Sequence, residues 1–253
     1  MTCLLPRLTF LLLAVCGTLP IAVAQQFPDG ASLKIAIIGD STVSDYPPQA
    51  LKRGWGQELP QFLDLKVAVI NAAIPGTSSK TFPPLAWKGI LAAKPDFILI
   101  QFGHNDSHPK GQPESTDAAT DYKENLRRYV TEARAASAIP LLVTPPHRRT
   151  FDASGHPTQE LASYAQAMRE VATELGVPLI DLQAESGALF ASLGEAGTTA
   201  FTVNLTDTAD RPGQEDRSHF TEPGAMEIAR LVATDLQKID PRLQAVVRLP
   251  SEP

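Results

Sequence analysis

A serine, a histidine and an aspartate in this chain could together perform nucleophilic catalysis. Ser41 follows Gly39 and Asp40 at the end of an apolar segment. A serine hydroxyl attacks a carbonyl efficiently only when a nearby base removes its proton. Of the five histidines, only His219 has a carboxylate three residues earlier, at Asp216. A turn of that length can bring the carboxylate onto Nδ1 of the imidazole, which leaves Nε2 free to accept the serine proton.

Each of these residues also has an ordinary structural interpretation. Ser41 could simply cap a helix that follows the strand. His219 could be an exposed loop histidine beside an unrelated acid. Asp181, at the end of another apolar segment, competes with Asp216 for the role of acid. We favour Asp216 because its separation from His219 is locally constrained, whereas Asp181 would need a tertiary contact.

Three groups could stabilise the negative charge that develops on an ester carbonyl oxygen under attack. The backbone N–H of Ser41 is the first candidate. The N–H of Gly76 is the second, because a glycine lets the backbone approach a substrate closely. The side-chain amide of Asn105 is the third. Gly76 and Asn105 also suit ordinary turns, so neither residue alone identifies an oxyanion hole.

Five short apolar segments predict buried parallel strands, because they are rich in Ile, Val and Leu and do not alternate with polar residues. Segments with helical spacing lie among them. The predicted strands are Leu33–Ile38, Val67–Asn71, Phe97–Phe102, Ile139–Val143 and Val177–Leu182, and the predicted helices are Asp121–Ala136, Leu161–Leu175 and Ala225–Leu236. This order predicts an α/β fold with a doubly wound, five-stranded parallel sheet and helices on both faces.

The polar residues gather after the predicted strands. Ligands of open parallel sheets bind beyond the carboxyl ends of the strands. Four strands run into polar or flexible sequence there: Gly39–Thr42, Asn71 with Pro75–Gly76, Gly103–Asp106 and Pro145–His147. The stretches Ser107–Thr120 and Thr198–Arg217 are predicted as long loops, which are often functional. We therefore expect one site at one edge of the sheet.

The composition excludes several function classes. Hydrophobic residues make up 43% and charged residues 20% of the chain, as in ordinary globular proteins, and the net charge of −6 argues against binding of nucleic acid or anionic membranes. Residues 1–24 predict a secretory signal peptide, with Arg7 before an apolar run and a small-x-small sequence at the end. Residues 25–253 are then predicted to form one domain. Both cysteines, Cys3 and Cys16, lie in the predicted signal, so we expect no disulfide and no thiolate metal site.

Taken together, these residues resemble the SGNH (GDSL-like) hydrolase superfamily. The resemblance rests on four blocks in the family's order: Gly39-Asp40-Ser41, Gly76, Gly103-His104-Asn105-Asp106, and Asp216 to His219. It implies a flavodoxin-like three-layer sandwich that works without a metal or cofactor. It also implies that Ser41 is the nucleophile, His219 the base and Asp216 its orienting acid. Ser41, Gly76 and Asn105 would be the oxyanion donors.

Within the superfamily, the chain looks similar to the rhamnogalacturonan acetylesterase group. The similar blocks are Gly39–Val43, Arg53–Gly56, Ser78–Phe82, Gln101–Asp106, Tyr122–Leu126, and Arg148-Arg149 with Phe151. Such enzymes remove O-acetyl groups from pectin backbones. Members of the group often carry arginine directly after the hole glycine and again before Thr-Phe, where this chain has Thr77 and Lys80. This departure leaves fewer fixed cations there to recognise a galacturonate carboxylate.

Three further side chains are candidate substrate contacts. Arg148 and Arg149, after the fourth predicted strand, could hold a carboxylate bidentately. Trp87, like Trp55, could stack on a sugar face. The ordinary alternatives are solvated surface arginines and tryptophans of the core.

The sequence thus predicts a secreted serine esterase, periplasmic or extracellular, that deacetylates a plant cell-wall polysaccharide through an acetyl-serine intermediate. The resemblance favours rhamnogalacturonan as the polymer. We expect a monomer that binds neither nucleic acid nor, once the signal is removed, a membrane. The alternatives are an SGNH esterase acting on acetylated xylan, peptidoglycan or a lipid ester, and a non-catalytic glycan-binding domain.

Overall fold

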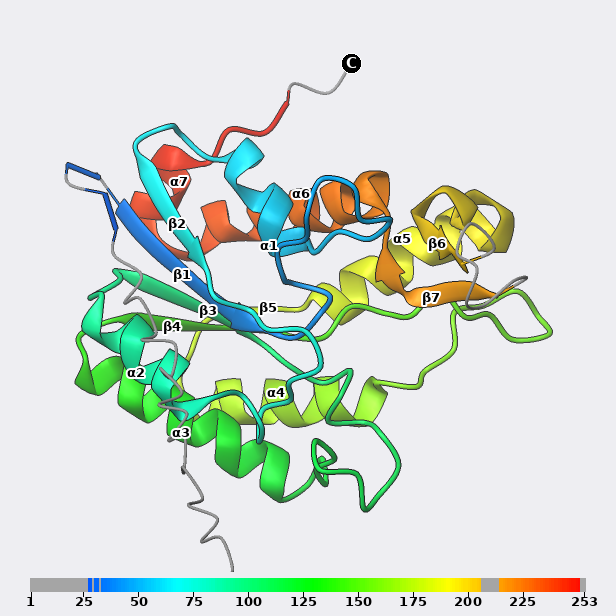
Figure 1. The fold of residues 1–253 in the computed structure, drawn as a ribbon, viewed down its shortest axis with the longest axis horizontal. Coiled ribbons are helices and arrows are strands. Elements are labelled where there is room, and N and C mark those ends of the chain that lie inside the picture. Colours follow the sequence, from blue (N-terminus) through cyan, green and yellow to red (C-terminus); the bar gives the residue numbers. More distant parts are fainter. Residues whose placement is uncertain (1–26, 29, 32, 206–213, 251–253) are drawn as a thin grey trace, which may run out of the picture.

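A parallel five-stranded sheet forms the centre of the molecule (Figure 1). The structure is a computed structural model that describes residues 27–28, 30–31, 33–205 and 214–250. The strands are β1 (Leu33–Gly39), β2 (Val67–Asn71), β3 (Phe97–Gln101), β4 (Ile139–Val143) and β5 (Leu179–Ile180), in the order β2-β1-β3-β4-β5. All neighbouring pairs in this sheet are parallel. This order confirms the predicted doubly wound, flavodoxin-like α/β fold.

Both faces of the sheet are covered, which explains why its strands appear in the sequence as continuous apolar runs. Successive side chains of a strand point to opposite faces. In β1, Ile35 and Ile37 belong to the core on one face, and Ala36 and Ile38 belong to the core on the other. All four side chains are fully buried.

Helices form the two outer layers (Figure 1). The core on one face includes residues of α1 (Trp55–Glu58), α5 (Leu182–Gly197), α6 (Glu222–Ile239) and α7 (Pro241–Val246), and the core on the other includes residues of α2 (Pro84–Ala92), α3 (Asp121–Ala135) and α4 (Ala162–Leu175). Two short 3-10 helices are η1 (Leu59–Phe62) and η2 (Thr199–Phe201). Helix α4 is followed by Gly176, which has the left-handed φ of 56° typical of a C-terminal cap. Thr221 caps the N-terminus of helix α6, because its side chain accepts a hydrogen bond from the Gly224 N–H.

The sequence prediction was wrong in the stretch Thr198–Arg217, which was expected to be one loop. The described part contains η2, then β6 (Thr202–Asn204), and β7 (Glu215–Phe220) begins before its end. Strands β6 and β7 pair antiparallel, away from the central sheet. Strand β7 was not recognised because its sequence is almost entirely polar and only Phe220 is buried. The fifth strand is also shorter than predicted, because Asp181 already caps α5.

Two predictions about the ends of the chain remain predictions. The predicted signal peptide, residues 1–24, lies outside the described residues, and the assignment of 25–253 to one domain rests on the sequence pattern alone. Within the described ranges, no helix combines the length and the apolar character needed to cross a bilayer.

Candidate active site

The candidate site lies where β1 and β3 end side by side. Gly39 at the end of β1 pairs with Gln101 at the end of β3, so Ser41 and Asn105 follow two adjacent strand ends. The strand order reverses here, because β2 lies on one side of β1 and β3 on the other. The backbone after β2 folds back onto β1, with the Ile74 N–H donating to the Gly39 carbonyl at 3.0 Å. Such a reversal is the usual ligand position in a doubly wound sheet.

Ser41, His219 and Asp216 form one continuous hydrogen-bonded chain. The Ser41 Oγ lies 2.8 Å from Nε2 of His219, although the two residues are 178 positions apart in the sequence. The Nδ1 of the same ring lies 2.6 Å from Oδ2 of Asp216. With Nδ1 protonated and donating to the carboxylate, Nε2 is the acceptor for the serine proton. The arrangement can activate the serine as a nucleophile.

The surroundings of Asp216 keep its carboxylate ionised. Burial favours the neutral acid, but the hydrogen bond and charge of His219 outweigh it. The N–H groups of Ser218 and His219 also donate to Oδ1, each at 3.0 Å. The pKa of Asp216 therefore lies well below its ordinary value. A fixed negative charge beside Nδ1 stabilises the imidazolium that forms when Nε2 accepts a proton.

The turn that carries Ser41 is held by a buried polar network. Asp40 accepts hydrogen bonds from the Thr42 N–H at 2.9 Å and from Gln101 Nε2 at 3.2 Å. Gln101 in turn accepts one from Trp55 Nε1 at 2.9 Å. Burial raises the pKa of Asp40, although Thr42 and other partners oppose the shift. The sequence analysis named Gln101 only within a block of resemblance and gave it no role, although a polar residue at the end of the otherwise apolar β3 was an available signal.

Three N–H donors face the same edge of the sheet. Nδ2 of Asn105 donates to the Thr77 carbonyl at 2.7 Å, and a primary amide has a second hydrogen left to donate. Gly76 has a φ of 79° in an exposed turn, where glycine avoids backbone strain. In the part of the chain that the structure describes, the N–H groups of Ser41 and Gly76 have no protein acceptor. All three groups are thus able to receive a ligand oxygen.

Asp106 fixes the segment that carries Asn105. Its carboxyl group accepts hydrogen bonds from the N–H of Ser79 at 3.1 Å and from the Thr116 hydroxyl at 3.0 Å, and it contacts the Ser79 hydroxyl at 2.5 Å. Burial raises the pKa of Asp106 to about 6, although these partners favour the charged form. Gly103, before Asn105, has a φ of 145° and lies so close to Pro145 that a side chain would clash with its ring. The loop after β3 is therefore tightly determined.

Arg149 does not lie where a substrate could reach it, which corrects the expectation that it holds a carboxylate of the polymer. The side chain is 1% exposed. Its guanidinium donates to the backbone carbonyl of Asp216 at 3.2 Å, to that of His219, and to the Thr202 hydroxyl at 3.1 Å. It also stacks over the Phe220 ring, 4.4 Å from the centroid. Burial lowers the pKa of Arg149 to about 9.

Trp87 also lies away from any substrate surface, so the expected sugar stacking is wrong. It is 2% exposed and packs edge-to-face on Tyr129, with the ring centroids 5.1 Å apart. Its Nε1 donates to the carboxylate of Glu132. Trp87 is therefore a core residue of α2, which is the commoner position for a large apolar side chain on a helix.

Arg148 lies next to the loop that carries Asn105. It donates to Glu160 at 2.8 Å and to the His104 carbonyl at 3.3 Å, and its contact with substrate stays a prediction.

Asp181, the alternative acid, binds the guanidinium of Arg169 through two contacts of 2.8 Å and caps α5. Its carboxylate is therefore committed elsewhere and does not orient His219.

No group of three or more His, Cys, Asp or Glu side chains in the described residues is placed to hold a metal ion. That the enzyme needs no cofactor remains an expectation from the sequence.

The chain is similar in sequence to two proteins of Bacillus subtilis. It is 37% identical to the rhamnogalacturonan acetylesterase RhgT over 215 residues, and this alignment covers 82% of this chain and 90% of RhgT. It is also 37% identical over 223 residues to the probable rhamnogalacturonan acetylesterase YesY, covering 85% of this chain and 97% of that protein.

Solved structures share the fold. The crystal structure of YxiM from Bacillus subtilis superposes with a TM-score of 0.70 at 29% identity, covering 81% of this chain and 56% of that one. The acetylxylan esterase Axe2 from Geobacillus stearothermophilus gives a TM-score of 0.61 at 21% identity, covering 81% of this chain and 94% of that one.

Fold and sequence similarity together define a carboxylic ester hydrolase, an acetylesterase of the SGNH type. The chain belongs to the GDSL-like lipase/acylhydrolase family, whose model matches residues 37–225.

Proposed function

We propose that this protein is a secreted serine acetylesterase that removes O-acetyl groups from a plant cell-wall polysaccharide, with rhamnogalacturonan as its main substrate. The observation that carries the catalytic part is the chain of contacts from Ser41 Oγ through His219 to Asp216, with distances of 2.8 and 2.6 Å. The similarity to RhgT and YesY supports the choice of polymer. The predicted signal peptide supports secretion.

In the first step, the Ser41 Oγ attacks the acetyl carbonyl carbon while His219 Nε2 takes its proton. The carbonyl oxygen becomes an oxyanion, which accepts hydrogen bonds from the N–H groups of Ser41 and Gly76 and from Asn105 Nδ2. As the tetrahedral intermediate collapses, the bond to the sugar oxygen breaks and His219 donates its proton to that oxygen. The products are the free sugar hydroxyl and an acetyl ester on Ser41.

In the second step, water attacks the acetyl-serine ester. His219 Nε2 takes a proton from the water, and the same donors hold the second oxyanion. Collapse breaks the bond to Ser41 Oγ, which recovers its proton from His219, and acetate leaves. Asp216 stays ionised throughout and keeps the ring oriented, because its pKa lies well below its ordinary value.

The test is acetate release by the wild type and by Ser41→Ala from acetylated rhamnogalacturonan, acetylated xylan, muropeptides and 4-nitrophenyl esters of increasing acyl length. The wild type should act best on the pectic polymer and on the acetyl ester, and Ser41→Ala should remove nearly all activity while leaving the circular dichroism spectrum unchanged. Retained activity in that variant would exclude Ser41 as nucleophile. Faster release from xylan, muropeptides or long-chain esters would assign another substrate to the same chemistry. A wild type that binds glycan but releases nothing would indicate the non-catalytic alternative.

A further inference from the structure

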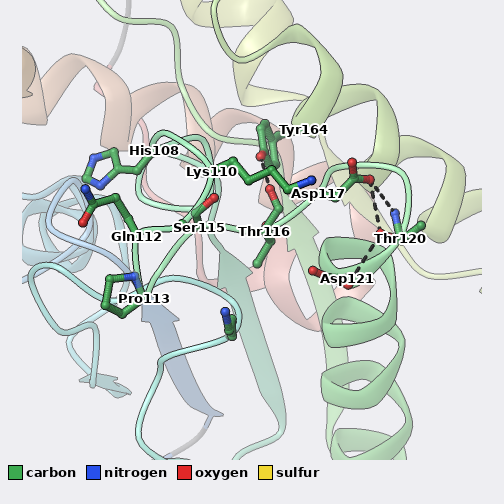
Figure 2. A pocket seen from close by; sticks show the side chains of 12 residues that line it. His108, Lys110, Gln112, Pro113, Ser115, Thr116, Asp117, Thr120, Asp121 and Tyr164 are labelled. Atoms are coloured by element: carbon green, nitrogen blue, oxygen red, sulfur yellow. Dashed lines mark hydrogen bonds between the residues drawn. The ribbon is translucent and has the colours of Figure 1, made fainter.

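A polar pocket of about 760 Å³ is lined mostly by the loop that joins β3 to α3. Figure 2 shows its side chains, with Tyr164 contributed by α4 and Thr120 and Asp121 at the start of α3. The lining residues used below are Lys80, His108, Lys110, Thr116, Asp117 and Asp121. We call this hollow the Lys80–Lys110 pocket. No step of the mechanism uses it.

The pocket and the candidate oxyanion hole share one wall. The carbonyl of Thr77 accepts the hydrogen bond from Asn105 Nδ2, and Lys80 follows Thr77 by three residues. Three residues span at most roughly 11 Å of extended chain. The backbone of Lys80 therefore lies within about the length of two sugar residues of the Thr77 carbonyl that Asn105 contacts. The carboxyl group of Asp106 accepts hydrogen bonds from both Ser79 and Thr116, so it joins the segment before Lys80 to the loop that lines the pocket. A pocket at this separation from Asn105 is within the span of a polymer whose acetyl group lies at Ser41.

The positive charges of the pocket are available to a ligand. In the described part of the chain, neither Lys80 nor Lys110 forms an ion pair, and both are exposed. The negative charges are committed to local structure. Asp117 accepts hydrogen bonds from the N–H groups of Ala119 and Thr120, at 2.9 and 3.1 Å. Asp121 lies in the first turn of α3, where the helix dipole stabilises its charge.

Three further polar side chains at the pocket wall have partners within the protein. His108 lies 2.6 Å from the carboxylate of Glu114. The hydroxyl of Tyr164 lies 2.6 Å from the carbonyl of Thr116 and 2.9 Å from that of Asp106, so it can donate to either, and the Thr116 hydroxyl donates to Asp106. Lys80 and Lys110 are thus the exposed ammonium groups of this pocket that form no ion pair among the described residues, although Lys80 also attracts the carboxylate of Glu114. Ammonium groups with three donors each suit a carboxylate.

We propose that the Lys80–Lys110 pocket binds a uronate carboxylate of the acetylated polysaccharide, next to the sugar whose acetyl group is at Ser41. This inference rests on the proposed function and adds the chemical feature by which the enzyme distinguishes an acidic polymer from a neutral one. It also replaces the buried Arg149 as the source of positive charge for such a substrate.

The experiment compares the wild type with the double variant Lys80→Gln/Lys110→Gln on three substrates. These are an acetylated rhamnogalacturonan oligosaccharide with free carboxylates, the same oligosaccharide with its carboxyl groups reduced to alcohols, and 4-nitrophenyl acetate. The matched control is Lys94→Gln, an exposed lysine before β3, at the opposite edge of the sheet. Circular dichroism establishes that each variant is folded.

The double variant should raise the KM for the acidic oligosaccharide roughly tenfold, as expected for two exposed charge pairs, and leave kcat unchanged. Both lysine variants should match the wild type on the reduced oligosaccharide and on 4-nitrophenyl acetate. Added salt should weaken the wild-type preference for the acidic substrate. An unchanged KM for the acidic oligosaccharide, or an equal loss on the reduced one, would overturn the inference. If the wild type releases no acetate even from 4-nitrophenyl acetate, the proposed function itself fails.

Discussion

The guanidinium of Arg149 donates a hydrogen bond to the backbone carbonyl of His219. The same nitrogen, Nη2, also donates to the carbonyl of Asp216 at 3.2 Å. One buried side chain that follows β4 thus holds β7 at both members of the His–Asp pair. Because Ser41 lies on a separate segment, this anchor helps to set the distance between the serine and the imidazole.

Arg149→Met should lower kcat for 4-nitrophenyl acetate about tenfold or more with little change in KM. The variant removes the hydrogen bonds that the guanidinium donates to the carbonyls of Asp216 and His219, and a hydrogen bond from a charged group typically contributes about 1.5–3 kcal/mol. The melting temperature should fall as well. Steady-state kinetics and thermal unfolding measure both effects. Arg149→Lys should rescue little, because one ammonium cannot reproduce the fork of the guanidinium. An unchanged kcat in the folded variant would rule out this positioning role.

Asn105→Ala should reduce kcat by about a hundred- to a thousandfold, the usual effect of removing one oxyanion donor. The KM should stay near the wild-type value, because the donor acts mainly when negative charge develops on oxygen. Asn125→Ala is a suitable control, since Asn125 donates to Ser79 in the same polar region but does not face the serine. A loss confined to KM would instead point to a role in substrate binding.

Asp106 should make the stability of the protein depend on pH. Its pKa is about 6 in the folded protein against an ordinary value of 3.8, so the folded state keeps a proton in an interval where the unfolded chain has lost it. The contribution of Asp106 to the free energy of unfolding should therefore rise as the pH falls from about 7 to about 4, by up to ~3 kcal/mol. Urea unfolding of the wild type and Asp106→Asn at several pH values measures this. A difference between the two that does not change with pH would contradict the prediction.

Trp87→Phe should lower the melting temperature and leave the KM for acetylated polysaccharide unchanged. The smaller ring gives up buried contact area and the hydrogen bond to Glu132, but no sugar-binding surface is lost. Thermal unfolding and kinetics on the polymer distinguish the two effects. A KM several times higher in a stably folded variant would restore the stacking interpretation.

Much of the fold could be predicted from the sequence, because strands that are buried on both faces have continuous apolar sequences. The segments at β1, β2 and β4 were placed within a residue of their observed ends. The β6–β7 pair could not be predicted in this way, since residues such as Glu215 and Arg217 give a strand no apolar pattern. Its position depends on contacts from distant parts of the chain.

The candidate site also combines parts that the sequence pattern predicts with parts that depend on tertiary contacts. The spacing of Asp216 and His219 is local and could be proposed from the sequence, and the polar residues after the strands indicated the edge at which Ser41 and His219 meet. The positions of Arg149 and Trp87 could not be judged, because a sequence does not show whether a long side chain turns inward. For Arg149 the inward position depends on carbonyl groups of β7, a strand that the sequence itself did not reveal.

Because His219 and Asp216 belong to one short strand, their mutual geometry survives any movement that carries β7 as a unit. The distance between Ser41 and the imidazole joins two separate parts of the molecule, so it depends on tertiary contacts such as those of Arg149. A displacement of the β6–β7 pair by about an ångström would lower the catalytic rate about a hundredfold, while the central sheet stayed folded. Inactivation and unfolding are consequently separable events in this architecture.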